Sequence, residues 1–184
     1  MTELPQSAPT PATVAAWLVL DTLPVETVPW YAAAWLVNGH DSQTLRELAG
    51  LDGRDPHAVR DLLPAALAEI GIALPTTDLA AATDAFRHLA ELCLAGRAGE
   101  RWVAQMVEEI VIRTDYSNSV IDLPLGQLYG ADDAWEGGWG PTVEELTATV
   151  RAACVEQISF DGFTRSSPPT DDEPVTKHYP ISEY

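Results

Sequence analysis

Basic residues are scarce in this chain of 184 residues, which contains 10 Lys and Arg against 28 Asp and Glu. The formal net charge is -18, and this balance argues against direct binding of nucleic acid, because phosphates call for a basic surface. The only lysine is Lys177, which excludes P-loop and Schiff-base chemistry from the folded part of the chain. An acidic surface instead attracts cationic partners.

Long apolar runs are missing as well. No stretch approaches the roughly 18 consecutive apolar residues that cross a bilayer, and no early segment combines the charge, apolar run and cleavage site of a secretory signal. We therefore expect no membrane association and a cytoplasmic location. Cysteine is limited to Cys93 and Cys154, which we expect to be buried thiols, although the sequence alone leaves a disulfide open.

Motifs of catalysis and metal binding are also absent. The sequence contains no G-x-G-x-x-G, G-x-S-x-G or H-E-x-x-H motif, no Cys-x-x-Cys pair and no EF-hand spacing. Its four histidines never lie three or four residues apart, the spacing that places two metal ligands on one helical face: His40, His57, His88 and His178. We predict no catalytic residue, no cofactor and no metal, while acids brought together only by folding leave an enzyme open as an alternative.

Apolar residues recur at intervals of three and four along most of the chain, which predicts helices. Two starts are well marked: Asp55 followed by Pro56 is an N-cap before a helical proline, and Thr142 with Glu145 forms a capping box. Pro64 is expected to kink or split the helix in which it lies. Helical stripes are predicted near residues 14–18, 28–36, 45–48, 56–70, 79–93, 103–110 and 142–153. The best strand candidate, residues 120–123, could equally be a buried loop.

These patterns predict an all-α fold, a single-domain bundle of about six to seven helices over residues 12–165. Residues 1–11 are expected to be a flexible arm and residues 166–184 a disordered tail. Between the last two helices lies a long loop, residues 114–141, whose Tyr, Leu and Trp residues should pack onto the helices, with a short helix near residues 125–129.

The most informative local string is Trp-Glu-Gly-Gly-Trp-Gly-Pro at residues 135–141. Its glycines permit close backbone approach, so both indoles could point to one side. The two tryptophans either anchor the loop on the helices or form an aromatic–acidic recognition patch, in which carboxylates select cationic partners. On the second interpretation the partner-binding residues are Tyr129, Asp132, Asp133, Trp135, Glu136 and Trp139. Trp30 and Tyr31, near Trp35, suggest a further aromatic surface.

The chain resembles a group of small, acidic, helical proteins of unknown function from high-GC actinobacteria. The resemblance is carried by Leu-Arg-Glu-Leu-Ala-Gly-Leu at residues 45–51, by Asp-Pro-His-Ala-Val-Arg-Asp-Leu-Leu-Pro at 55–64, and by Ala-Trp-Glu-Gly-Gly-Trp-Gly at 134–140. It spans roughly residues 12–158 and implies no particular activity or catalytic residue.

The leading hypothesis is a non-enzymatic acidic helical protein that binds a partner protein with a basic surface, in an immunity-type or regulatory interaction. The alternative is a small-molecule-binding protein or enzyme that uses a cleft beside residues 114–141. A structural subunit of a homo-oligomer is a third hypothesis.

Overall fold

The computed structural model describes residues 8–137 and 140–160, and all regular structure in these ranges is helical. The all-α prediction is confirmed, and residues 120–123 form no strand, because Val120 lies in a short helix and Leu123 in the turn after it. The α-helices are α1 (Pro11–Val19), α2 (Val28–Val37), α3 (Gln43–Ala49), α4 (Pro56–Glu69), α5 (Asp78–Leu94), α6 (Glu100–Arg113), α7 (Asn118–Ile121), α8 (Asp132–Gly137) and α9 (Val143–Ser159). Two 3₁₀ turns are η1 (Val25–Thr27) and η2 (Gly126–Leu128).

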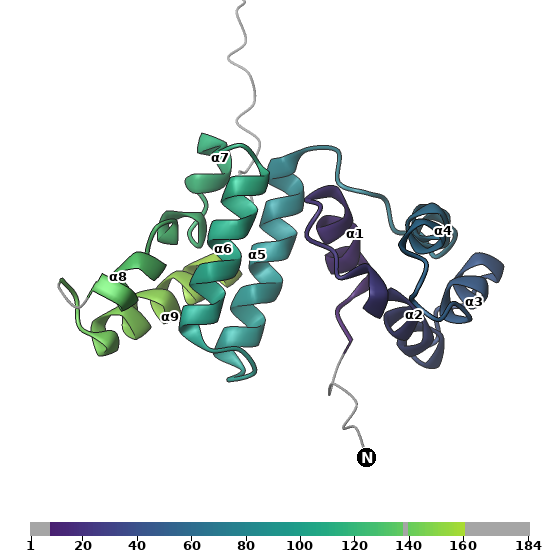
Figure 1. Ribbon diagram of the computed structural model, residues 1–184, viewed down its shortest axis with the longest axis horizontal. Helices are drawn as coiled ribbons and strands as arrows, with labels where there is room; N and C mark the ends of the chain where they lie inside the picture. Colours follow the sequence, from purple (N-terminus) through teal and green to yellow (C-terminus); the bar gives the residue numbers. More distant parts are fainter. Residues whose placement is uncertain (1–7, 138–139, 161–184) are drawn as a thin grey trace, which may run out of the picture.

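Two apolar cores lie on either side of α1 (Figure 1). We call the groups around them the α2–α4 lobe and the α5–α9 lobe. Val14 and Ala15 of α1 belong to the core of the α2–α4 lobe. Ala16 of α1, and Leu20 just after the helix, belong to the core of the α5–α9 lobe. Trp17 packs against both cores. A single helix therefore joins the two lobes into one domain.

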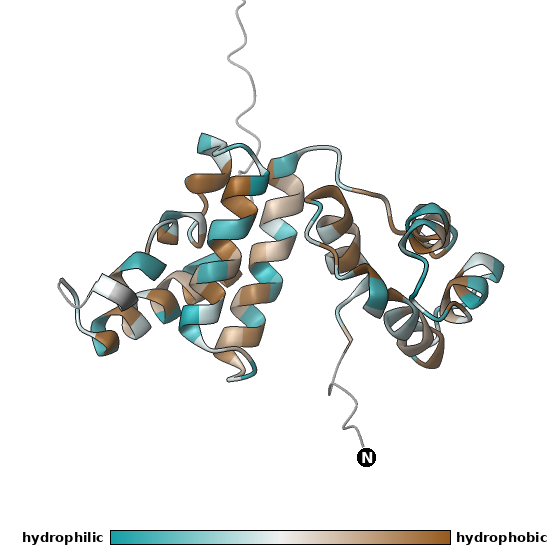
Figure 2. Ribbon diagram, viewed as in Figure 1, coloured by the Kyte–Doolittle hydropathy of each residue, from teal (hydrophilic) through white to brown (hydrophobic). Residues whose placement is uncertain are grey.

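The α5–α9 lobe is built from the longest amphipathic helices of the chain. Apolar and polar segments alternate along α5 and α6 (Figure 2), as expected where one face of each helix packs inward. Phe86 of α5 is fully buried, and α5 packs against both α6 and α9. The Thr142–Glu145 capping box that begins α9 forms as predicted.

In the α2–α4 lobe, side chains cap the starts of α3 and α4. Asp55 accepts hydrogen bonds from the backbone N–H groups of His57 and Ala58, as predicted for the start of α4. Pro64 lies inside α4 without splitting it. Leu63 and Leu67, on either side of this proline, are both fully buried in the same core, and this shared packing holds the helix together where proline removes a backbone hydrogen bond.

The segment over residues 114–141 contains α7, η2 and α8, and the short helix expected near residues 125–129 is present as η2. Gly126 is required here, because a Cβ atom at this position would lie 2.0 Å from the backbone oxygen of Val120. The buried side-chain oxygen of Gln157 in α9 accepts a hydrogen bond from the backbone N–H of Leu125 at 3.2 Å. These contacts fix the segment against the helices.

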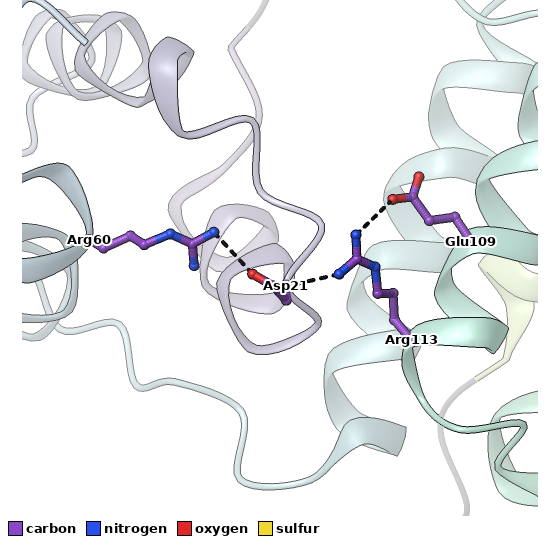
Figure 3. Close-up of polar contacts among 4 residues, drawn as sticks. All are labelled: Asp21, Arg60, Glu109 and Arg113. Atoms are coloured by element: carbon purple, nitrogen blue, oxygen red, sulfur yellow. Dashed lines mark hydrogen bonds and ion pairs between the residues drawn. The ribbon is translucent and has the colours of Figure 1, made fainter. Parts of the chain in front are cut away.

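A network of ion pairs links the lobes at the end of α1 (Figure 3). Asp21 has a left-handed backbone, with φ of 53°. Its two carboxylate oxygens each lie 3.0 Å from an arginine, Arg60 in α4 and Arg113 in α6. Arg113 also approaches Glu109 at 3.8 Å. All four side chains are substantially exposed, so the network orients the lobes more than it stabilises them.

The ordered structure begins earlier than expected for a flexible arm over residues 1–11. Pro11 is the first residue of α1, and the backbone oxygen of Pro9 accepts a hydrogen bond from the indole N–H of Trp35 at 2.8 Å. Residues 1–7 of the predicted arm and the whole predicted tail, 166–184, lie outside the described residues. No helix among those described is both long and apolar enough to cross a bilayer.

Candidate functional site

The first three residues of the string at 135–141 lie in α8, which begins at Asp132 and Asp133. Two carboxylates in the first turn suit a helix N-terminus, where the backbone N–H groups carry partial positive charge. Trp135 is half-buried and packs against the core of the α5–α9 lobe. This packing fits the anchoring interpretation of Trp135. Trp139 and the side chain of Glu136 lie outside the described residues.

Asp132 is engaged inside the fold. Its carboxylate lies 2.7 Å from Nε of Arg101 in α6, and Nε2 of Gln105 approaches it at 3.4 Å. The hydrogen bond from Arg101 lowers the pKa of the Asp132 carboxyl, with a smaller contribution from Gln105. Asp132 therefore attaches α8 to α6, and its side chain is 19% exposed.

Tyr129 is brought against a second tyrosine that the sequence did not single out as a site residue. The rings of Tyr129 and Tyr116 meet edge to face, with centroids 5.8 Å apart. They are 41% and 50% exposed. Tyr116 follows Asp115 just after α6, and both residues have left-handed backbones, with φ of 55° and 51°. Such conformations cost about 1–3 kcal/mol each for residues other than glycine. The backbone that holds the exposed ring of Tyr116 is therefore in an unfavourable conformation at both residues.

Two carboxylates from different helices lie near this tyrosine pair. The pKa of Tyr129 is raised first by partial desolvation, then by Tyr116 and Glu108, by a hydrogen bond between the two tyrosine side chains, and by Asp133. Glu108 lies in α6 and Asp133 in α8. Neither carboxylate forms an ion pair with another described residue. We call these four residues the tyrosine–carboxylate face.

Among the predicted site residues, the fold thus brings Tyr129 and Asp133 together and directs Asp132 to Arg101. Tyr116 and Glu108 are additions that the sequence could not supply, because they lie far from residues 129–133 along the chain. In α6, Glu109 pairs with Arg113 four residues later, whereas Glu108 forms no ion pair with another described residue.

Six arginines form ion pairs with carboxylates of the same chain, and carboxylates outnumber these arginines on the described surface. Arg101 holds α8, and Arg151 of α9 lies 2.7 Å from Glu100 of α6. Further pairs join Arg46 to Asp41, Arg54 to Asp52, Arg60 to Asp21, and Arg113 to Asp21 and Glu109. With 28 acidic residues against 10 basic ones in the chain, these pairs use only a minority of the carboxylates.

Groups that could perform covalent or metal chemistry are not gathered in the described residues. No three or more His, Cys, Asp or Glu side chains are placed there to hold a metal ion. Cys93 and Cys154 are free and fully buried, which confirms the expected buried thiols. Burial, followed by the neighbouring Cys93, raises the pKa of Cys154 to about 12. A thiol with that pKa stays protonated at neutral pH and is a poor nucleophile.

No protein-family model, curated protein or solved structure matches this chain. The features of the molecule that bear on its function are therefore the tyrosine–carboxylate face and the charge distribution around it.

Proposed function

We propose that the protein is a non-enzymatic acidic helical protein that binds a partner protein with a basic surface, in an immunity-type or regulatory interaction. The observation that carries this proposal is the tyrosine–carboxylate face: two half-exposed tyrosine rings in contact, with the charges of Glu108 and Asp133 near enough to raise the pKa of Tyr129. The excess of carboxylates over the whole chain supports it.

The chemistry of this face suits arginine or lysine side chains. A cation over a tyrosine ring contributes about 0.5–1 kcal/mol at an exposed site, and an adjacent carboxylate adds a charge-assisted hydrogen bond. The surrounding negative charge speeds the approach of a basic protein. Arginine is the side chain that uses both contributions best, because its planar group stacks on a ring and bonds a carboxylate.

Buried free thiols suggest where the interaction takes place. Free cysteines are typical of reducing compartments, and Cys93 and Cys154 are both unpaired. We therefore place the proposed interaction in the cytoplasm.

The alternative, a ligand-binding or catalytic cleft beside residues 114–141, gains less support. Leu123 and Leu125 of this segment are almost completely buried, and Gly126 touches the backbone of Val120. Both features indicate that the segment fills space against α6 and α9, which is a packing role.

The proposal is tested with a labelled arginine-rich peptide as the basic probe and fluorescence anisotropy as the readout. Replacing both carboxylates of the face (E108Q/D133N) should weaken binding roughly fivefold, since each exposed charge contact contributes about 0.2–1 kcal/mol and two such contacts are lost. The matched control, E26Q/D61N in the α2–α4 lobe, removes the same charge from exposed positions and should bind within about twofold of the native protein.

The tyrosines give a second arm to the same test. Tyr129→Ala should weaken binding, whereas Tyr129→Phe, which keeps a ring, should retain most of it. Equal losses in E108Q/D133N and in E26Q/D61N would show that the peptide responds to total charge, and the proposed face would then be abandoned. The unaltered protein is also used to isolate a native partner at low and at high salt. The isolated partner should displace the labelled peptide from the protein.

A further inference from the structure

Helix α2 is apolar on every side, yet only one side is covered. Its sequence, Val-Pro-Trp-Tyr-Ala-Ala-Ala-Trp-Leu-Val, contains no charged residue. Val28, Ala32 and Trp35 are buried in the core of the α2–α4 lobe, whereas Trp30 is 62% exposed and Val37 is 87% exposed. Helices that are apolar all round are normally covered on all sides. The outer side of α2 therefore has no cover among the residues that the structure describes.

The exposed residues form one continuous stripe. Trp30, Ala33, Ala34 and Val37 follow one another at intervals of three, one and three, so they share one side of the helix. Both alanines are half-exposed, between the two large exposed side chains. We call these four residues the α2 stripe. In Figure 1 α2 lies between α1 and α3 within the α2–α4 lobe.

The stripe also lies in a stretch without charge, in a molecule that is otherwise strongly negative. No Asp, Glu, Lys or Arg occurs between Glu26 and Asp41. Two copies of a chain with net charge -18 repel each other across most of their surfaces. They can meet at lowest electrostatic cost through this stretch, whereas a basic partner would find no carboxylate on the stripe. The charge pattern thus favours a second copy of the chain over a basic partner as the occupant.

We propose that the α2 stripe binds the α2 stripe of a second copy, forming an antiparallel, two-fold symmetric dimer. The spacing is self-complementary: an axis between Ala33 and Ala34 places Trp30 of each copy opposite Val37 of the other. Small residues at the crossing let two helices approach to about 8–10 Å. A large ring then lies against a smaller branched side chain at each end, as a two-fold interface requires.

The size of the stripe sets the strength of this dimer. A tryptophan buries about 150–250 Å², so one Trp, one Val and two Ala from each copy fall short of the roughly 800 Å² per partner of a standard interface. The dimer is consequently reversible, with a dissociation constant of the order of micromolar or weaker. It leaves the tyrosine–carboxylate face, on the other lobe, open.

The first test measures mass against concentration for the full chain by sedimentation equilibrium, at low and high salt. The mass should rise from 19.9 kDa toward twice that value with concentration. Salt should strengthen this association, because it screens the repulsion between the acidic copies. Binding of a basic probe should respond to salt in the opposite direction, so failure of one proposal is distinguishable from failure of the other. A mass that stays at the monomer value across the range overturns the dimer.

Substitutions locate the interface. Val37→Glu places a charge on the stripe and Trp30→Ala removes its largest side chain, and each should weaken self-association about tenfold or more. The matched control is Trp102→Ala, which removes another exposed tryptophan, in α6. Circular dichroism confirms that each variant is folded. Self-association that persists unchanged in both stripe variants, or that is lost in the control, contradicts the assignment.

A cross-linking experiment tests the orientation independently. Because Cys93 and Cys154 are fully buried, a cysteine introduced at Ala33, next to the axis, can be joined to its symmetry mate by a short bis-maleimide reagent. The exposed Ala148 of α9 supplies the control position. Covalent dimer should form with Ala33→Cys and remain low with Ala148→Cys; equal yields would overturn the two-fold arrangement.

Discussion

The two lobes each bury an apolar core, but they differ in what one helix of each exposes. The α5–α9 lobe is made of long amphipathic helices whose outer sides carry carboxylates, including Glu108 and Asp133. The α2–α4 lobe contains α2, which has no charge and leaves Trp30 and Val37 exposed. The comparison teaches that the placement of charge along the chain, and not only its total, distinguishes the exposed surfaces of an acidic protein.

The largest effects are expected from truncating the two cores. Phe86→Ala in the α5–α9 lobe should lower the free energy of unfolding by about 3–5 kcal/mol, and Leu63→Ala in the α2–α4 lobe by about 2–5 kcal/mol, because both side chains are fully buried. Since α1 belongs to both cores, each variant should still unfold in a single transition. Urea unfolding followed by circular dichroism and by amide hydrogen exchange in both lobes checks this. If one lobe unfolded at a lower urea concentration than the other, α1 would not couple the two cores, and the lobes would have to be treated as separate units.

Replacing one glycine in each lobe should give clearly different losses of stability. Gly126→Ala should destabilise the protein by about 1–3 kcal/mol, because the new Cβ would overlap the backbone of Val120 and Ile121. Gly50→Ala in the other lobe meets only ordinary contacts, the nearest at 3.4 Å, and should change stability by less than about 0.5 kcal/mol. Thermal unfolding of both variants provides the measurement. Similar losses in the two proteins would argue against the close approach at Gly126.

The helix caps are expected to contribute equally in the two lobes. Asp55 caps α4 and Thr142 caps α9, and replacing either with alanine should cost about 1 kcal/mol. Asp61→Ala is the control for loss of a carboxylate, since Asp61 is an exposed residue inside α4. Chemical denaturation compares the three variants. A cap whose removal has no effect would show that packing alone determines where that helix begins.

The smallest effect concerns pH at the junction of the lobes. His88 of α5 lies edge to face with Trp17 at a centroid separation of 5.4 Å. Its pKa is lowered, first by burial and then by the positive charge of Arg97. The unfolded chain, with a histidine pKa of about 6.5, therefore binds this proton more readily than the folded one. Stability should fall as pH drops below about 6.5, until the folded histidine is also protonated.

His88→Gln should remove this part of the pH dependence, and the exposed His57→Gln should leave it in place. The midpoint of thermal unfolding is followed between neutral pH and mildly acidic pH. An unchanged slope in His88→Gln would show that other groups determine it.

Local signals explain why so much of the helical structure could be predicted from the sequence. The starts of α4 and α9 are encoded by capping side chains and a proline within a few residues, and their buried faces follow the helical repeat. The prediction that α4 would kink or split at Pro64 did not anticipate that the buried Leu63 and Leu67 would hold it in one piece. Energies from packing overrode the local preference.

The candidate site was only partly predictable, because its members come from different helices. Tyr129 and Asp133 were identified from a local string, but the ring of Tyr116 and the carboxylate of Glu108 reach them only through the packing of α6 against η2 and α8. The same packing pairs Asp132 with Arg101. No spacing rule in a single sequence states which of two adjacent aspartates turns inward.

The position of α1 between two cores has a consequence for synthesis on the ribosome. Val14 and Ala15 find their neighbours in α2–α4 soon after they emerge, whereas Ala16 and Leu20 must wait for α5, which begins at Asp78. We expect a nascent chain that has just completed α4 to display an uncovered apolar strip of α1, available to chaperones. That strip then serves as the template on which α5, and with it the second half of the molecule, is assembled.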